Sequence, residues 1–273
     1  LRAGECPELW CVEYPDRISK IACSYLDAGA DMIQTNSFGA NRIKLKHFGA
    51  EQRAAELNEA AASISRKSAG PDRHVIASVG PTGKIIMAGE ISPEEVYEPF
   101  AVQIIALEKG GADACCIETF ADIEEACTAI KAARDNTRME IICTFTYEKT
   151  VRNEYRTIMG VSPEETTPAV IEAGADIIGT NCGNGMEEMV PVVKQLRRAA
   201  PEYPILVHAN AGMPQNQGGT IVFPETPDVM AEKAVETASA GANIIGGCCG
   251  TTPEHIRAIA ASLKLFKTQQ LAR

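Results

Sequence analysis

Short apolar runs alternate with longer amphipathic segments along the whole chain. The runs that predict strands lie near residues 31, 74, 113, 140, 176, 204 and 243. They are continuous rather than alternating, which is typical of parallel strands covered on both faces. Four of them follow the same motif, Gly-Ala and then Asp or Asn, at Gly29, Gly111, Gly174 and Gly241. Each motif predicts a helix that ends at a glycine and turns directly into a buried strand.

The segments between these runs carry signals for helix starts. Ser92-Pro93-Glu94-Glu95 and Ser162-Pro163-Glu164-Glu165 each place a capping Ser before a Pro, with a Glu three residues after the Ser. Unbroken alternation of strand and helix predicts a parallel sheet and, by its count, a closed (β/α)8 TIM barrel in the α/β class. A doubly wound open sheet is the alternative, but no G-x-G-x-x-G motif follows a strand.

A TIM barrel has eight strands, one more than the sequence displays. The first helix, roughly Asp16 to Ala28, already leads into the run near residue 31, which therefore corresponds to the second strand of a barrel. We expect the first strand to precede Leu1. The 273 residues then form a single barrel domain, residues 1–273, within the usual size range of the fold.

The composition favours a soluble protein that binds neither nucleic acid nor membrane. No apolar run approaches the roughly 18 residues of a membrane span, and the net charge of −10 opposes binding to a phosphate backbone. Ten cysteines are too sparse and irregular for a disulfide scaffold. We therefore expect a cytoplasmic protein whose thiols bind metal or take part in chemistry.

Three cysteines are predicted to meet at one end of the barrel. Cys182 follows the sixth barrel strand, and Cys248 and Cys249 follow the eighth, so one strand separates them. Functional groups of such barrels lie at the carboxyl ends of the strands. Three thiolates on zinc leave a fourth position for substrate, as in catalytic sites. His208 is interpreted as a polar residue of the barrel mouth that is bonded to backbone.

Three other cysteines serve as a contrast. Cys115, Cys116 and Cys143 lie inside apolar runs with no adjacent glycine. Buried thiols behave as small apolar side chains, so we expect these three in the core.

Several motifs resemble those of one enzyme family. The most specific are residues 246–256, GGCCGTTPEHI, and residues 179–183, GTNCG; further matches lie at 5–10, 27–31, 35–42, 80–83 and 210–214. Together they resemble the homocysteine S-methyltransferase family from end to end, and most of all the homocysteine-binding module of vitamin B12-dependent methionine synthase. The resemblance implies a (β/α)8 barrel with zinc on Cys182, Cys248 and Cys249.

The resemblance also implies the reaction and the substrate contacts. Homocysteine would present a zinc-activated thiolate to a methyl donor and become methionine, with no protein nucleophile. Glu118 matches the carboxylate that binds the substrate's ammonium group, whereas Asn36 and Asn210 match loop positions that face the pocket. The alternative for Glu118 is an acid that caps the helix at the Asp122 turn. The family's Asp-Gly-rich loop after its first strand has no counterpart in this sequence.

The methyl donor follows less directly from the residues. Methylcobalamin, S-methylmethionine, S-adenosylmethionine and betaine serve the family. The loops favour a methylcorrinoid, methylcobalamin, carried by another domain or protein, because this chain has no Asp-x-His-x-x-Gly segment of its own.

Two functions of other classes stay open on the residues alone. In the first, the barrel is non-catalytic and the zinc ion has only a structural role. In the second, the barrel is zinc-independent and residues 80–84, GPTGK, bind a phosphate. That loop lacks the spacing of a phosphate-binding P-loop and the Ser or Thr after Lys84.

Overall fold

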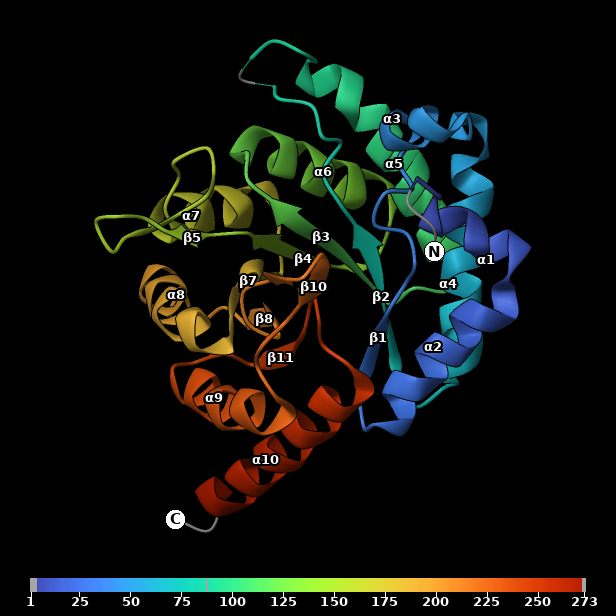
Figure 1. Ribbon diagram of the computed structural model, residues 1–273. Helices are drawn as coiled ribbons and strands as arrows, with labels where there is room; N and C mark the ends of the chain where they lie inside the picture. The colour runs from blue at the N-terminus through green and yellow to red at the C-terminus, as the bar shows by residue number, and fades with distance from the viewer. Residues whose placement is uncertain (1–3, 87, 272–273) are drawn as a thin grey trace.

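Seven parallel strands form one curled sheet in the computed structural model, which describes residues 4–86 and 88–271. Figure 1 shows the strands surrounded by helices, in the chain order β1-β2-β3-β4-β7-β8-β11. The strands are β1 (Met32–Gln34), β2 (His74–Val79), β3 (Ala114–Phe120), β4 (Glu140–Phe145), β7 (Ile177–Gly185), β8 (Ile205–Asn210) and β11 (Ile244–Gly247). Each apolar run in the sequence forms one of these strands, and the predicted α/β class is confirmed.

The helices cover the outer face of the sheet. The long ones are α2 (Pro15–Asp27), α4 (Ala54–Ala69), α5 (Pro93–Lys109), α6 (Ile123–Asn136), α7 (Pro163–Ala173), α8 (Met186–Ala199), α9 (Pro227–Ser239) and α10 (Pro253–Leu271). Two short helices, α1 (Trp10–Glu13) and α3 (Arg42–Leu45), lie near the N-terminus. At the four repeated Gly-Ala motifs the glycine φ angles lie between 99° and 118°, a left-handed conformation in which glycine is favoured.

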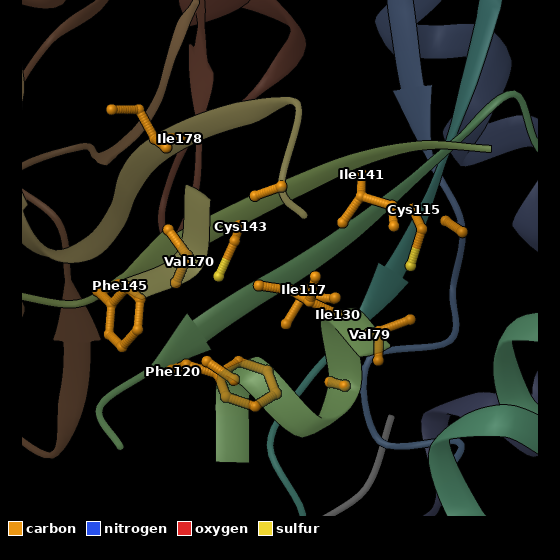
Figure 2. Packing of buried hydrophobic residues seen from close by; sticks show 14 of the residues in the cluster. Val79, Cys115, Ile117, Phe120, Ile130, Ile141, Cys143, Phe145, Val170 and Ile178 are labelled. Atoms are coloured by element: carbon orange, nitrogen blue, oxygen red, sulfur yellow. The ribbon is translucent and has the colours of Figure 1, made fainter. Parts of the chain in front are cut away.

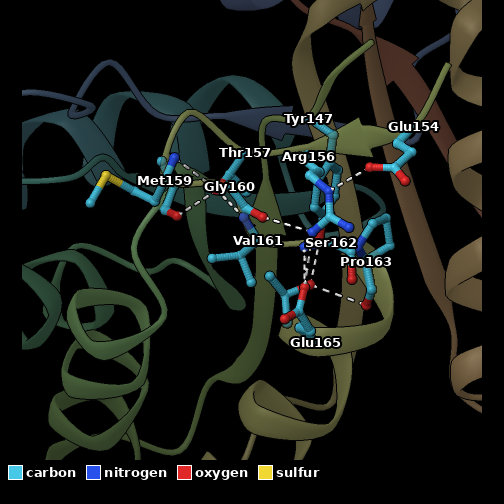
Figure 3. Close-up of polar contacts among 12 residues, drawn as sticks. Tyr147, Glu154, Arg156, Thr157, Met159, Gly160, Val161, Ser162, Pro163 and Glu165 are labelled. Carbon is cyan, nitrogen blue, oxygen red and sulfur yellow. Dashed lines mark hydrogen bonds and ion pairs between the residues drawn. The ribbon is translucent and has the colours of Figure 1, made fainter. Parts of the chain in front are cut away.

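The helix starts form as the sequence predicts. Ser92 and Ser162 both complete a capping box with the Glu three residues later. Figure 3 shows the second of these starts, where Arg156 also donates to the Gly160 carbonyl at 2.8 Å and to Glu165 at 3.4 Å. These contacts tie the loop after β4 to the first turn of α7. That loop contains the hairpin β5 (Glu148–Lys149) and β6 (Tyr155–Arg156).

The core has two layers, one on each face of the sheet. The outer layer lies between strands and helices and includes Cys115 and Cys143, which Figure 2 shows among isoleucine and phenylalanine side chains. The inner layer contains only strand residues and forms the floor of the barrel: Ile76, Cys116, Ile142 and Leu206. Each buried aliphatic side chain contributes about 1.5–3 kcal/mol. Cys115, Cys116 and Cys143 are at most 1% exposed, so the expectation that they lie in the core is correct.

The sheet is open between β1 and β11. Among the described residues, β1 pairs only with β2, and β11 pairs only with β8. Every residue of β1 and β11 is partly exposed, whereas all of β8 is buried. Helices α2 and α10 meet beside the opening, where the Tyr25 hydroxyl donates to the Thr251 carbonyl at 2.9 Å. The fold is therefore a TIM-type barrel with one strand fewer; the position of that strand before Leu1 stays a prediction.

No helix in the described part of the chain is long and apolar enough to cross a membrane.

Candidate metal centre

Three thiols converge at the carboxyl ends of β7 and β11. The sulfurs of Cys182, Cys248 and Cys249 all lie within 4.8 Å of one another. The Cys182–Cys249 distance is 3.9 Å, and the Cys248–Cys249 distance is 4.0 Å. A tetrahedral zinc with Zn–S bonds of about 2.3 Å places its sulfurs roughly 3.8 Å apart. The three side chains therefore fit a zinc ion with little movement and leave its fourth position to another ligand.

Asn181 fixes the end of β7 next to Cys182. Its Oδ1 accepts from Thr119 N at 2.9 Å and from Thr144 Oγ1 at 2.7 Å, and its Nδ2 donates to Thr119 Oγ1 at 2.7 Å. Thr146 Oγ1 donates to the Asn181 carbonyl at 2.9 Å. Cys182 has a φ of 58°, a left-handed conformation that costs a non-glycine residue roughly 1–2 kcal/mol. The bonds of Asn181 to β3 and β4 hold this strained geometry.

The Cys248–Cys249 loop is held by the end of β8. Cys248 N donates to the Ala209 carbonyl at 2.7 Å, and Cys249 N donates to Asn210 Oδ1 at 3.1 Å. Ala211 N donates in turn to the Cys249 carbonyl at 2.9 Å. Asn210 thus supports the peptide that carries a thiol, and its side chain is buried beneath the loop.

The thiols share their protons unequally. Hydrogen bonding with Cys248 and Cys249 holds the pKa of Cys182 well below its usual range, and hydrogen bonding with Cys182 raises the pKa of Cys248. In the core, by contrast, burial raises the pKa of Cys115 to about 12. Several adjacent thiolates repel one another unless a cation lies between them. The chemistry of the cluster therefore suits a divalent, thiophilic metal.

Glu118 lies inside the barrel mouth, near the end of β3. In the strand order, β4, β7 and β8 separate β3 from β11. It is 7% exposed, accepts from Gln34 Nε2 at 3.0 Å, and accepts a short hydrogen bond from Ser78 Oγ. Burial raises the pKa of this carboxyl group, and the two hydrogen bonds oppose the rise. The alternative role as a helix cap is wrong, because Asp122 itself caps α6 through the backbone N–H groups of Glu124 and Glu125.

Asn36 and His208 differ from what their positions in the sequence suggest. The Asn36 Nδ2 group donates to the Pro7 carbonyl at 2.8 Å and to Cys11 Sγ at 3.4 Å, so its donors serve the N-terminal segment. His208 is buried, and its Nδ1 has no hydrogen-bond partner among the described residues. The expectation that this ring bonds to backbone is therefore not met at Nδ1. Burial lowers the pKa of His208 to about 4, which keeps the imidazole neutral.

The glycine-rich loop at residues 80–84 is not free to bind a phosphate. The N–H and hydroxyl of Thr82 both donate to Glu125 Oε1, at 2.7 and 2.6 Å. A carboxylate of the protein thus uses donors that a phosphate would need. This geometry opposes the phosphate-binding barrel.

Sequence reasoning did not single out Ser78 or Asn181. Both lie on inward-facing positions of their strands, in step with Ile76 and Gly179 two residues before. Alternation along each strand, counted from the apolar floor of the barrel, is the signal that could have found them.

Comparison with known proteins places the chain in a family. A family model described as homocysteine S-methyltransferase matches residues 1–263. Methionine synthase from Mycobacterium tuberculosis is 32% identical over 270 residues, and methionine synthase from Mycobacterium leprae is 32% identical over 267 residues. These matches cover 96% and 94% of the chain but only 23% and 22% of the relatives. The chain therefore spans less than a quarter of the length of these relatives.

Solved structures share the fold. The metallated form of the homocysteine methyltransferase MmuM from Escherichia coli superposes with a TM-score of 0.77, is 23% identical, and covers 96% of this chain and 90% of its own. A methyltransferase from Methanosarcina mazei gives a TM-score of 0.62 at 11% identity, with 93% and 86% covered. At 23% and 11% identity, these structural similarities establish the barrel fold alone.

Proposed function

The chain belongs to the homocysteine S-methyltransferase family, and we propose that it is the homocysteine-binding barrel of a zinc-dependent methyltransferase that forms methionine. The observation that carries this proposal is the convergence of three thiols, from two strand ends, at distances that suit one tetrahedral metal. The family membership supplies the substrate, and the thiols supply a means of activating its sulfur.

Cys182, Cys248 and Cys249 are the proposed metal ligands. Zinc, when bound, would keep the homocysteine thiol deprotonated at neutral pH and hold its sulfur at the open position. The protein's part is to keep three thiolates at the right spacing, through the bonds of Asn181 on one side and of Asn210 on the other. No nucleophile from the protein is required.

Glu118 is the proposed partner of the substrate's ammonium group. Its carboxylate is buried with two neutral donors, Ser78 and Gln34. A buried charge is costly unless it is paired, and a substrate cation would supply that pair. Asn36 and Asn210 stay proposed as residues of the pocket wall. Because both side chains already bond to the protein, we expect their contacts with substrate to be weaker than that of Glu118.

In the proposed reaction the substrate sulfur attacks the methyl carbon in one displacement. The new sulfur–carbon bond forms as the bond between methyl and donor breaks, and the donor keeps the electron pair. We propose methylcobalamin as the donor, carried by another domain or protein. The likeness to methionine synthases, of which this chain matches less than a quarter, supports a donor held outside the barrel.

The donor is tested by assaying methionine formation with methylcobalamin and, separately, with S-methylmethionine, S-adenosylmethionine and betaine. We expect the fastest turnover with methylcobalamin. A preference for a sulfonium donor or for betaine would replace the corrinoid in this proposal.

The catalytic role of zinc is tested by metal content and folding together. We expect about one zinc per chain, lost in Cys182→Ala while circular dichroism stays unchanged. Collapse of the fold when the metal is removed would instead favour a zinc that only staples the barrel. We also propose a reducing compartment, the cytoplasm, because all ten cysteines are unpaired.

A further inference from the structure

Glu225 lies where three loops of the barrel mouth meet. Its backbone N donates to the Ala211 carbonyl at 2.9 Å, and its backbone carbonyl accepts from His255 Nε2 at 2.9 Å. Its carboxylate Oε2 accepts from Met186 N at 3.2 Å. One residue on the segment between β10 (Thr220–Val222) and α9 therefore bonds to the end of β8, to α8 and to α10.

These three elements are the ones that support the thiols. Met186 begins α8, directly after the strand that carries Cys182. His255 lies in the first turn of α10, which follows Cys249. Ala211 donates to the Cys249 carbonyl at 2.9 Å. Glu225 is therefore bonded to both sides of the thiol cluster without touching a sulfur.

Close packing accompanies these bonds. A Cβ atom on Gly185 would lie 1.9 Å from Glu225 Oε1, and a Cβ on Gly250 would lie 2.1 Å from Phe223 Cγ. A side chain at Gly250 would overlap Phe223, and a side chain at Gly185 would displace the Glu225 carboxylate. Segment 223–225 therefore packs closely against both cysteine-bearing loops. Phe223 contacts the first at Gly250, one residue after Cys249, and Glu225 contacts the second at Gly185, just before α8.

His255 has one possible tautomer in this arrangement. Thr252 N, which can only donate, lies 3.1 Å from His255 Nδ1. Nδ1 must therefore accept, and the ring proton lies on Nε2, which donates to the Glu225 carbonyl. The side chain is buried. His255 thus joins the Cys249 loop to Glu225 with a donor of fixed direction.

We propose that Glu225, together with His255, is a positioning unit that sets the spacing between Cys182 and the Cys248–Cys249 pair. This inference rests on the zinc site proposed above and goes beyond it. The two loops are far apart in sequence and come from strands that do not pair with each other. Metal sites need their ligands held to within roughly 0.5 Å, and Glu225 supplies a direct bridge between the loops.

The test measures metal affinity in the purified protein by chelator competition, with the absorption spectrum of the cobalt-substituted form as a second readout. Glu225→Ala removes the carboxylate, and we expect zinc affinity to fall by about 10- to 100-fold, as loss of outer-shell partners does. Glu225→Gln keeps an acceptor of the same shape, so we expect affinity within about threefold of the parent. Should Glu225→Ala fail to fold, the His255 variants below carry the test.

Glu125→Ala is the matched control. Like Glu225, Glu125 accepts a backbone N–H with its carboxylate, from Thr82 at 2.7 Å. It lies on α6, is buried where Glu225 is half-buried, and bonds to the loop after β2. We expect this variant to lower the unfolding temperature and to leave zinc affinity and the cobalt spectrum unchanged. A matching loss of affinity in both variants would overturn the proposal, because general destabilisation would then explain it.

Two substitutions of His255 separate its two bonds. Gln places an amide donor near the position of Nε2, whereas Asn places an acceptor near the position of Nδ1. We expect His255→Gln to retain more zinc affinity than His255→Asn, since only Gln restores the bond to Glu225. Equal affinities, or parent-like affinity in Glu225→Ala, would overturn the positioning role. Absence of zinc binding in the parent protein would instead overturn the metal site itself.

Discussion

The two sides of the barrel mouth are built with different rigidity. The thiol side, formed by β7, β8 and β11, fixes Cys249 through both its N–H and its carbonyl. The carboxylate side, formed by β1, β2 and β3, holds Glu118 through two side chains, one of them Gln34 on the edge strand β1. All residues of β1 are partly exposed. The proposed metal ligand Cys249 is thus held through its backbone groups, whereas the proposed partner of the substrate's ammonium group is held by side chains at a more open edge.

The largest effect should come from a ligand on the thiol side. We expect Cys249→Ala to weaken zinc binding by more than the roughly 100-fold that loss of an outer-shell partner costs, and to abolish methionine formation. Metal content and turnover of the purified protein measure both. Cys23→Ala, which removes a half-buried thiol of α2, should change neither. Full activity in Cys249→Ala would contradict the proposal that the thiol side binds the metal.

Glu118→Gln should affect substrate binding and leave metal binding intact. The amide cannot pair with a cation, so we expect KM for homocysteine to rise about 10- to 100-fold, in line with roughly 1.5–3 kcal/mol for a hydrogen bond to a charged group. Zinc content should match that of the parent. Loss of zinc in this variant would show that the carboxylate side and the thiol side are not independent.

The same substitution should stabilise the protein near neutral pH. Burial raises the pKa of Glu118 in the folded state. At a pH between the unfolded and the folded pKa, the folded chain therefore keeps a proton on Glu118 that the unfolded chain has lost. Stability therefore falls as pH rises from the ordinary Glu pKa of about 4.3 through the folded value. Thermal unfolding should show Glu118→Gln above the parent at pH 7.5, and the difference should vanish below pH 4. Glu202→Gln, at an exposed site, should show no such dependence.

The strands and the convergence of the three cysteines could be predicted from the sequence, because both depend on local patterns. Each strand begins as an apolar run after a turn; Cys182 lies toward the end of β7, and Cys248 directly follows β11. Glu225 could not be found in that way, because its partners Met186 and His255 lie 39 and 30 positions away and share no motif with it. The missing partner of His208 Nδ1 is likewise a property of packing, not of spacing.

The smallest effect should come from Asn36, whose proposed substrate contact competes with bonds inside the protein. Its Nδ2 already donates to the Pro7 carbonyl and to Cys11 Sγ. We expect Asn36→Ala to raise KM by no more than about fivefold, the equivalent of roughly 1 kcal/mol for one hydrogen bond, and to speed proteolysis near Pro7. If KM rose more than tenfold while proteolysis stayed unchanged, Asn36 would contact homocysteine directly. The carboxylate side would then bind its substrate through the loop after β1 as well as through Glu118.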